Sequence, residues 1–345
     1  MISPSLRSWL LTGLMSVSAG ALFYKLDTPL PWMIGPLLVT AIGRLSGLTL
    51  ATPKGTRNLG QWILGVALGL YFTPLAAAQT LGLLPAIIVG AVLAVAFGGL
   101  CSLGLSRLAG TDATTSFFSA MPGGASEMSI LAERYGARPD LVAAAHTLRV
   151  VLVVVCIPAL YYMLDLHGNA PVSDSASQVV PLQLTLLGLA GAGGALVWKA
   201  LGQANAWILG PLFVTAVATG TGLVETQIPS ALSGAGQLFI GTSLGCRFTP
   251  GFMREAPRFL SASLLTTALL SVLLSLAAFV IAHLAHLDTP STILGLSPGG
   301  IAEMCITAKA LHLSVPVVTS FHVIRAMVVV VLAGPAYQLS RRWLA

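Results

Sequence analysis

Two similar segments of this sequence each combine a helix-breaking Pro-Gly-Gly step with a carboxylate. They read MPGGASEMS at residues 121–129 and SPGGIAEMC at residues 297–305. Proline ends a helix, and glycine lets a ligand approach the backbone closely. A helix that restarts after the break points its N-terminal N–H groups and the positive end of its dipole at whatever lies there. We therefore predict that the breaks bind a small solute through Pro122, Gly123, Gly124, Ser126, Glu127, Pro298, Gly299, Gly300 and Glu303. The alternative is a kink that only packs between helices, with Glu127 as an N-terminal helix charge.

A second pair of motifs places a histidine and an arginine three residues apart, as His146 and Arg149 and again as His322 and Arg325. This spacing puts both side chains on one face of a helix. Arg149 is the tenth residue after Pro139, so at ~1.5 Å rise per residue it lies ~15 Å deep, near the centre of a bilayer. An arginine at this depth has to face the protein interior and find a partner, and it is a functional candidate by default.

Glu127 and Glu303 are the candidate partners of these two arginines. A Glu–Arg pair that breaks when solute arrives would couple binding to movement, whereas a permanent pair would only hold the broken segment in place. Glu127, Glu303, His146 and His322 are also the groups most easily tuned to carry a proton. We therefore expect the arginines to bind solute, and the carboxylates and imidazoles to carry protons or another coupling ion.

The composition indicates which elements position these residues. The chain has 345 residues, of which 56% are hydrophobic and only 8% charged, and its mean hydropathy is +0.89. Because a soluble domain carries about a quarter charged residues, this is a multi-span membrane protein. Its apolar runs are long enough for helices and lack the alternation of a membrane β-barrel. The 17 Lys and Arg are scattered singly, which excludes a phosphate-binding patch for nucleic acid, and the four cysteines form no CxxC pair. No metal and no cofactor is expected.

The chain consists of two homologous halves. The block PWMIGPLLVT at residues 31–40 returns as AWILGPLFVT at residues 206–215. The offset of this block is 175 residues. The Pro-Gly-Gly and His-x-x-Arg blocks return in the same order at an offset of 176 residues. Pro36 and Pro211, inside the first block, are expected to kink or partly unwind their helices. We predict a first repeat over residues 1–164, a linker over 165–181 and a second repeat over 182–345.

Each half contains five apolar runs that can span a membrane. The runs cover residues 6–24, 30–48, 58–78, 81–106 and 139–163, and then 182–200, 206–223, 233–250, 260–284 and 315–338. After the fourth run of each half, the Pro-Gly-Gly segment (111–136 and 288–312) either re-enters the membrane or crosses it as a broken helix. Lys and Arg fall on the cytoplasmic side most consistently if the segments are re-entrant, the linker is extracytoplasmic and both termini are cytoplasmic. Because five is an odd number, the halves are then inverted repeats.

The duplicated PWMIGPLL, MPGGASEMS and SPGGIAEMC blocks, together with the His-x-x-Arg pairs, resemble the bacterial membrane-protein family labelled AbrB over essentially the whole chain. That name is shared with a small soluble DNA-binding regulator, and members also often carry the label ammonia monooxygenase. Neither activity fits these residues. No element here is suited to reading a DNA groove, and a copper monooxygenase needs a cluster of histidines. The six histidines are scattered, with only His283 and His286 near each other. The resemblance therefore implies the duplicated membrane fold rather than a substrate.

The sequence thus predicts a secondary transporter of the bacterial cytoplasmic (inner) membrane. Its two Pro-Gly-Gly hairpins are expected to meet near the midplane and hold a small, carboxylate-bearing anion, with proton or sodium coupling and alternating access. No ATP-binding loop occurs, and the chain is expected not to be an enzyme. The expected partners are the lipid bilayer, the solute and the coupling ion, without nucleic acid; whether the chain forms a homodimer is left open. The alternatives are a channel-type facilitator, a membrane-bound enzyme and a membrane sensor.

Overall fold

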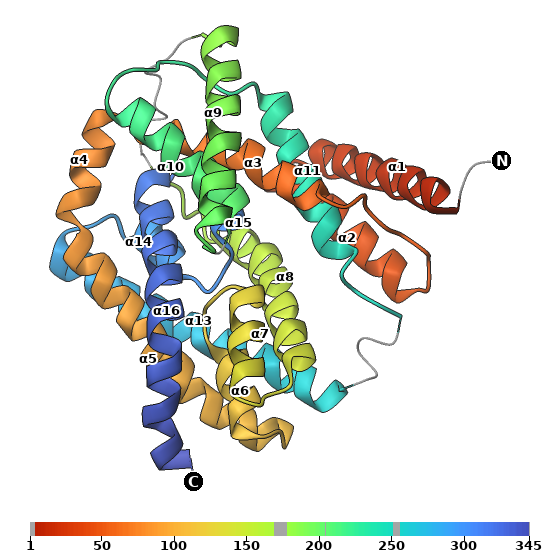
Figure 1. Ribbon diagram of the computed structural model, residues 1–345, viewed down its shortest axis with the longest axis vertical. Helices are drawn as coiled ribbons and strands as arrows, with labels where there is room; N and C mark the ends of the chain where they lie inside the picture. Colours follow the sequence, from red (N-terminus) through yellow and green to blue (C-terminus); the bar gives the residue numbers. More distant parts are fainter. Residues whose placement is uncertain (1–3, 169–177, 204, 251–255, 345) are drawn as a thin grey trace. The chain divides into compact units, whose positions relative to one another are not determined.

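The computed structural model describes residues 4–168, 178–203, 205–250 and 256–344. Every regular element in these ranges is an α-helix, which confirms the all-α class expected from the sequence (Figure 1). The central part of the predicted linker, residues 169–177, lies outside the described residues.

Among the described residues, six helices are long and apolar enough to cross a membrane. They are α1 (Pro4–Lys25), α5 (Leu84–Ala109), α8 (Pro139–Met163), α9 (Pro181–Ala200), α13 (Pro257–Ala285) and α16 (Val315–Leu344). They correspond to the first, fourth and fifth apolar runs of each half. Helices of this length and composition are typical of a multi-pass membrane protein.

The second and third runs of each half form shorter helices than expected. They are α2 (Pro31–Leu45), α3 (Thr56–Gly69), α10 (Ala206–Gly220) and α11 (Ser230–Gly245), with 15, 14, 15 and 16 residues. At ~1.5 Å per residue they reach ~21–24 Å, which is less than the ~30 Å of a bilayer core. Ten helices that each span the membrane unbroken are therefore not seen in the described part of the chain.

The apolar run over residues 58–78 does not form one continuous helix. The chain bends by 91° between α3 and α4 (Pro74–Gly82). Pro74 has no N–H to continue the backbone ladder, and it disfavours helical geometry at the residue before it. The two helices form one broken span or a re-entrant loop, so the described part of the chain has six candidate spans or, with this pair, seven.

The expected unwinding at Pro36 and Pro211 does not occur, because α2 and α10 continue through these residues. Each proline removes only one backbone hydrogen bond, which a packed helix tolerates. Gly35, just before Pro36, instead allows a close crossing: a Cβ added there would lie 2.7 Å from the carbonyl oxygen of Ala19 in α1.

Contacts divide the chain into two compact units, and each unit contains segments of both halves. Unit 1 comprises residues 1–78 and 170–252, and unit 2 comprises residues 79–169 and 253–345. The two sequence repeats are therefore not the compact units of the fold.

In unit 1, helices from the two halves pack against one another. Helix α10 contacts α3 and α9, and α2 contacts α1 and α11. A Cβ on Gly65 of α3 would lie 2.6 Å from the carbonyl oxygen of Ile208 in α10, and Gly241 of α11 lies against the carbonyl of Met33 in α2 in the same way. The two contacts join equivalent positions of the repeat, so the same close crossing is made twice.

Unit 2 contains all of the residues predicted to bind solute or carry ions. Helices α5 and α13 pack against each other, α16 packs against α5, and α8 packs against α13. One apolar core between them includes Ile87, Leu274 and Phe321. A second core, which includes Phe118 and Met128, surrounds the first Pro-Gly-Gly segment.

Candidate functional site

Each Pro-Gly-Gly segment forms two short helices separated by a break. The first hairpin consists of α6 (Ala113–Ala120) and α7 (Ala125–Arg134), and the second of α14 (Thr289–Leu296) and α15 (Ile301–Ala310). In the first hairpin, α6 and α7 contact each other and α8 (Figure 1). The predicted break between two arms is therefore confirmed in both segments.

An aspartate starts the first arm of each hairpin. Asp112 accepts a hydrogen bond of 2.7 Å from the Thr115 N–H, and Asp288 accepts one of 2.9 Å from the Ser291 N–H. These carboxylates satisfy N–H groups that a helix start leaves without backbone partners. The aspartates were not among the residues predicted for the site, and their role is to fix where the arms begin.

Both hairpins are closed at their base by the same hydrogen bond. The Arg138 N–H, just after α7, donates to the Thr115 hydroxyl near the start of α6 at 3.0 Å. The Ser314 N–H donates to the Ser291 hydroxyl at 3.0 Å in the second hairpin. Since the start of one arm meets the end of the other, the arms are antiparallel and the Pro-Gly-Gly step is the tip.

The two arginines hold the tips. Arg149 donates 2.6 Å hydrogen bonds to the carbonyl oxygens of Met121 and Gly123. Arg325 donates to the carbonyl oxygens of Ser297 and, at 2.9 Å, of Gly299, which are the equivalent residues of the second tip. Both arginines are buried, with 5% of their surface exposed. Carbonyls at the end of a helix carry the negative end of its dipole and have no donor within the helix, so a guanidinium is a suitable partner for them.

The Glu–Arg pair considered from the sequence is not formed. In the part of the chain that the structure describes, no carboxylate lies within 4.0 Å of either guanidinium. The arginines serve the carbonyls that end α6 and α14, whereas Glu127 and Glu303 follow the break and belong to the next helix. Backbone geometry, rather than side-chain charge, selects the partner of each arginine.

Each glutamate lies back over the glycine that starts its own helix. Gly124 is the N-cap of α7 and Gly300 the N-cap of α15. A Cβ added to either glycine would overlap the carboxylate of Glu127 or Glu303, respectively. A carboxylate in the first turn balances the positive end of the helix dipole. Glu303 is 5% exposed, whereas Glu127 is half-buried.

The two histidines are placed differently. His146 Nδ1 lies 2.9 Å from Arg149 Nη2, and its Nε2 lies 2.9 Å from the Phe118 carbonyl oxygen. A guanidinium has no acceptor, so Nδ1 accepts and Nε2 carries the proton, which makes His146 neutral. His322 donates from Nδ1 to the Val318 carbonyl of its own helix at 3.0 Å, and its buried Nε2 has no partner among the described residues.

The hairpin tips pack on the last helix of the other half. A Cβ on Gly123 would lie 3.0 Å from Val329 in α16, and one on Gly299 would lie 3.0 Å from Val153 in α8. The predicted tip residues of the two halves therefore belong to one packed unit. Ser126 is in α7, but its side chain lies outside the described part of the structure.

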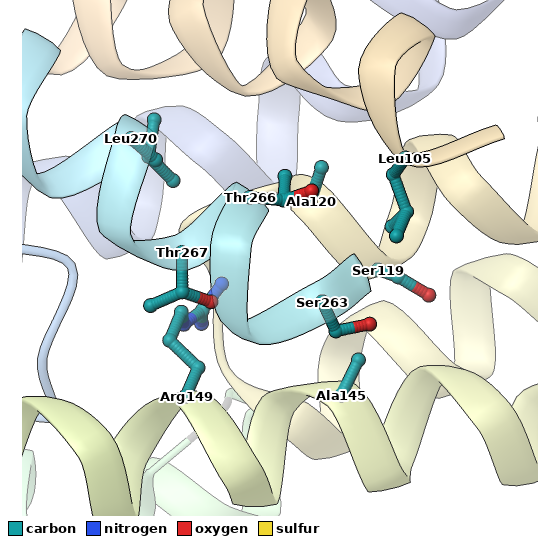
Figure 2. A pocket seen from close by; sticks show the side chains of 9 residues that line it. All are labelled: Leu105, Ser119, Ala120, Ala145, Arg149, Ser263, Thr266, Thr267 and Leu270. Carbon is teal, nitrogen blue, oxygen red and sulfur yellow. The ribbon is translucent and has the colours of Figure 1, made fainter. Parts of the chain in front are cut away.

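A small cavity with a volume of about 10 Å³ lies beside Arg149. We call it the Arg149 cavity (Figure 2), and its lining residues are Leu105, Ser119, Ala120, Ala145, Arg149, Ser263, Thr266, Thr267 and Leu270. Most of the hydroxyl groups that line the cavity come from α13, a helix that was not predicted to contribute to the site. The signal for it was the spacing of Ser263, Thr266 and Thr267, which places three hydroxyls on one face of an otherwise apolar helix.

A family model and two relatives match almost the whole chain. A model of the family described as "Transition state regulatory protein AbrB" matches residues 32–341. The protein named "Uncharacterized protein YhjN" from Bacillus subtilis (strain 168) is 27% identical over 94% of this chain and 91% of that protein. The protein named "Putative regulator AbrB" from Escherichia coli (strain K12) is 25% identical over 95% of this chain and 94% of that protein. With the family model matching most of its length, and with the duplicated blocks already indicating it, this chain belongs to the AbrB family.

Proposed function

We propose that the protein is a secondary transporter of the bacterial cytoplasmic membrane. It carries a small solute that bears a carboxylate, and it couples this movement to a proton or a sodium ion. The observation that carries the proposal is the pair of hairpins in unit 2, each broken at Pro-Gly-Gly and each held at its tip by a buried arginine.

Broken helices support transport because they are costly in a membrane. Irregular backbone at membrane depth is tolerated only where protein buries it or where it lines a water-filled cavity. In transporters built from repeats, the broken helices of the two halves form the solute site. Here the first tip packs on Val329 of the second half and the second tip on Val153 of the first half.

The charges favour an anionic solute. Two guanidinium groups are buried in one unit, and among the described residues neither has a carboxylate within 4.0 Å. Carbonyl dipoles compensate only part of a buried charge, so an anion gains the remaining attraction. A carboxylate also matches the planar donors of a guanidinium.

The carboxylates at the tips are the candidate sites for the coupling ion. Glu303 is buried without an ion pair in the described structure, so a proton or sodium ion would relieve an uncompensated charge. Among the histidines, His322 has an unpartnered Nε2 that can accept a proton, whereas both nitrogens of His146 are engaged. We therefore assign the coupling ion to Glu303, Glu127 and His322, and we consider His146 a weaker candidate.

In this proposal the halves are inverted repeats of five membrane-crossing segments, with re-entrant hairpins, an extracytoplasmic linker and cytoplasmic termini. The antiparallel arms support re-entrance, because both ends of each hairpin lie together. A single cysteine at Ser173, in a chain whose native cysteines are replaced, tests the topology. An impermeant maleimide added to intact cells is expected to label it, and labelling only from the cytoplasmic face would contradict the inverted repeat.

Uptake into liposomes that contain only the purified protein tests the function. We expect acetate, lactate or succinate to accumulate against its gradient when a pH or sodium gradient is imposed, and Arg149→Met to abolish this accumulation. Equilibration without accumulation would instead identify a channel-type facilitator. If no carboxylate enters while methylammonium does, the anionic solute is wrong.

A further inference from the structure

The residues around the Arg149 cavity differ from their equivalents in the second half. The residues equivalent to Ser119 and Ala145 are Gly295 and Phe321, and the ring of Phe321 fills the equivalent space. A Cβ on Gly295 would lie 3.0 Å from Phe321, and one on Gly90 would lie 3.3 Å from the same ring. The surroundings of the two equivalent arginines therefore differ. Arg149 borders the cavity, whereas the ring of Phe321 occupies the equivalent space in the half that contains Arg325.

The polar lining of the cavity is equally one-sided. Ser263 and Thr267 of α13 correspond to Ile87 and Ala91 of α5, which are apolar. Figure 2 shows the side chains of Ser263 and Thr267 on the α13 segment above Arg149 of α8, with Ser119 of α6 beside them. A second copy of the hydroxyl group is thus missing beside Arg325.

Two donors in the cavity lining are buried and have no partner. The Ser263 hydroxyl lacks a hydrogen bond among the described residues, although Ser263 is only 4% exposed, and the Arg149 Nε–H lacks one as well. Because the Arg325 Nε–H is equally unpaired in the described structure, the Ser263 hydroxyl is the donor that distinguishes this cavity. Buried polar groups are normally satisfied, so unpaired donors beside a positive charge indicate a site for an acceptor that is absent. With room for about one water-sized atom, that acceptor is a single oxygen atom.

We propose that the Arg149 cavity receives one carboxylate oxygen of the ligand, bound by Arg149 and by the Ser263 and Thr267 hydroxyls. The inference rests on the proposed function and narrows it, because it assigns the anion to one of the two arginines. Arg325 then serves to hold the second tip and does not bind solute.

The helix starts at the tips are poorer anion sites. Glu127 and Glu303 already lie over Gly124 and Gly300, where their charges occupy the positive ends of α7 and α15. A ligand carboxylate there would meet a like charge at close range, which is unfavourable. In the Arg149 cavity the nearest groups are hydroxyls and a guanidinium.

A double variant that copies the second half tests the site. Ser119→Gly/Ala145→Phe places the residues of the second half around Arg149. The equivalent residues, Gly295 and Phe321, already pack against each other in the second half. We expect acetate and formate, added as probes, to raise the melting temperature of the purified wild type, and the double variant to lose this shift. Stabilisation of the double variant equal to that of the wild type overturns the proposal.

Single hydroxyl variants provide a second measurement if the double variant does not fold. Thr267→Val and Ser263→Ala are each expected to weaken acetate binding about tenfold, since a hydrogen bond to a charged group is lost. The matched control is Thr266→Val, whose hydroxyl already donates to the Ala262 carbonyl at 2.8 Å. Equal affinities in Thr267→Val, Ser263→Ala and the wild type overturn the proposal, as does a wild type that neither probe stabilises.

Failure of the site and failure of the function are separable. If Ser119→Gly/Ala145→Phe still accumulates a carboxylate in liposomes, the cavity assignment is wrong and transport stands. If acetate stabilises the wild type through the cavity but no carboxylate is transported, the site stands and the transport function is wrong.

Discussion

The first hairpin (α6 and α7) and the second (α14 and α15) share the hydrogen bonds that hold them but differ in the groups around those bonds. Both are closed at the base by a hydroxyl that accepts a backbone N–H, and both are held at the tip by a buried arginine. These shared bonds satisfy backbone groups that any helix break exposes. They are therefore requirements of the hairpin itself.

The differences lie in the groups around this shared frame. The first hairpin has a partnered histidine, a half-buried glutamate and a polar cavity, whereas the second has an unpartnered histidine Nε2, a buried glutamate and a packed Phe321. A duplicated chain keeps what the frame needs in both copies and is free to specialise the remainder. Under the proposed function, we infer that the ligand binds beside the first hairpin, and that Glu303 and His322 beside the second are stronger candidates for coupling than Glu127.

Removal of Arg325 is expected to have the largest effect on stability. Arg325→Met leaves the carbonyls of Leu296, Ser297 and Gly299 without their donors in a packed environment, at a cost of roughly 3 kcal/mol or more. Arg149→Met should cost less, because water can enter the Arg149 cavity and serve the freed carbonyls. Melting temperatures of the purified variants give the order, and equal losses would contradict the difference between the two environments.

The histidines give the next largest contrast. His146→Leu removes the acceptor of an Arg149 N–H and the donor to the Phe118 carbonyl, so we expect a loss of about 2 kcal/mol. His322→Leu removes the Nδ1–H that donates to the Val318 carbonyl of its own helix and an Nε2 that has no partner in the described structure, so we expect a smaller loss of about 1 kcal/mol or less.

Uptake assays on the same two variants separate stability from coupling. If His322 carries the coupling proton, His322→Leu keeps most of its stability and loses accumulation under a pH gradient. Should His146→Leu be the more stable of the two proteins, the assignment of the ring hydrogen bonds is wrong.

Substitution of the N-cap glycines compares the two carboxylates. Gly300→Ala pushes the buried Glu303 carboxylate into packed surroundings, and a loss of about 1–3 kcal/mol is expected. Gly124→Ala should cost less, because the half-buried Glu127 can turn toward open space. Thermal unfolding of Gly300→Ala, Glu303→Ala and the double variant measures the coupling, and additive losses would show that the side chains do not meet.

The base hydrogen bonds are expected to give the smallest effect and no contrast. Thr115→Val and Ser291→Ala each leave one backbone N–H, of Arg138 or Ser314, without its acceptor, for about 1 kcal/mol in both hairpins. Equal shifts in melting temperature would support a frame common to both copies. A large inequality would show that one hairpin does not depend on its base.

Much of the hairpin geometry was predictable because it depends on local effects. Pro122 and Pro298 indicated where the arms break, since proline removes a donor and restricts its neighbour. The His-x-x-Arg spacing indicated that each histidine and arginine share a helix face, and His146 does contact Arg149. These inferences need only the chain within a few residues.

The partners of the arginines were not predictable in the same way. The sequence suggested Glu127 and Glu303 because charge is visible in a residue type. Carbonyl oxygens occur at every residue, so only the folded chain shows which of them lack a donor and lie near Arg149 or Arg325. The lengths of the helices in unit 1 were overestimated because an apolar run records composition and not where Pro74 bends the chain.

By itself the sequence indicated an all-α membrane protein with two similar halves. It also indicated a broken helix and a buried arginine in each half. These features follow from composition, periodicity and proline, which act locally. Only the tertiary structure decided that segments of both halves form each unit, that the glutamates lie over their own helix starts, and that a cavity lies beside Arg149 whereas Phe321 packs at the equivalent position of the second half. Those features depend on the volumes of side chains from distant segments, such as Ala145 and Phe321. These side chains come into contact only once the helices have packed.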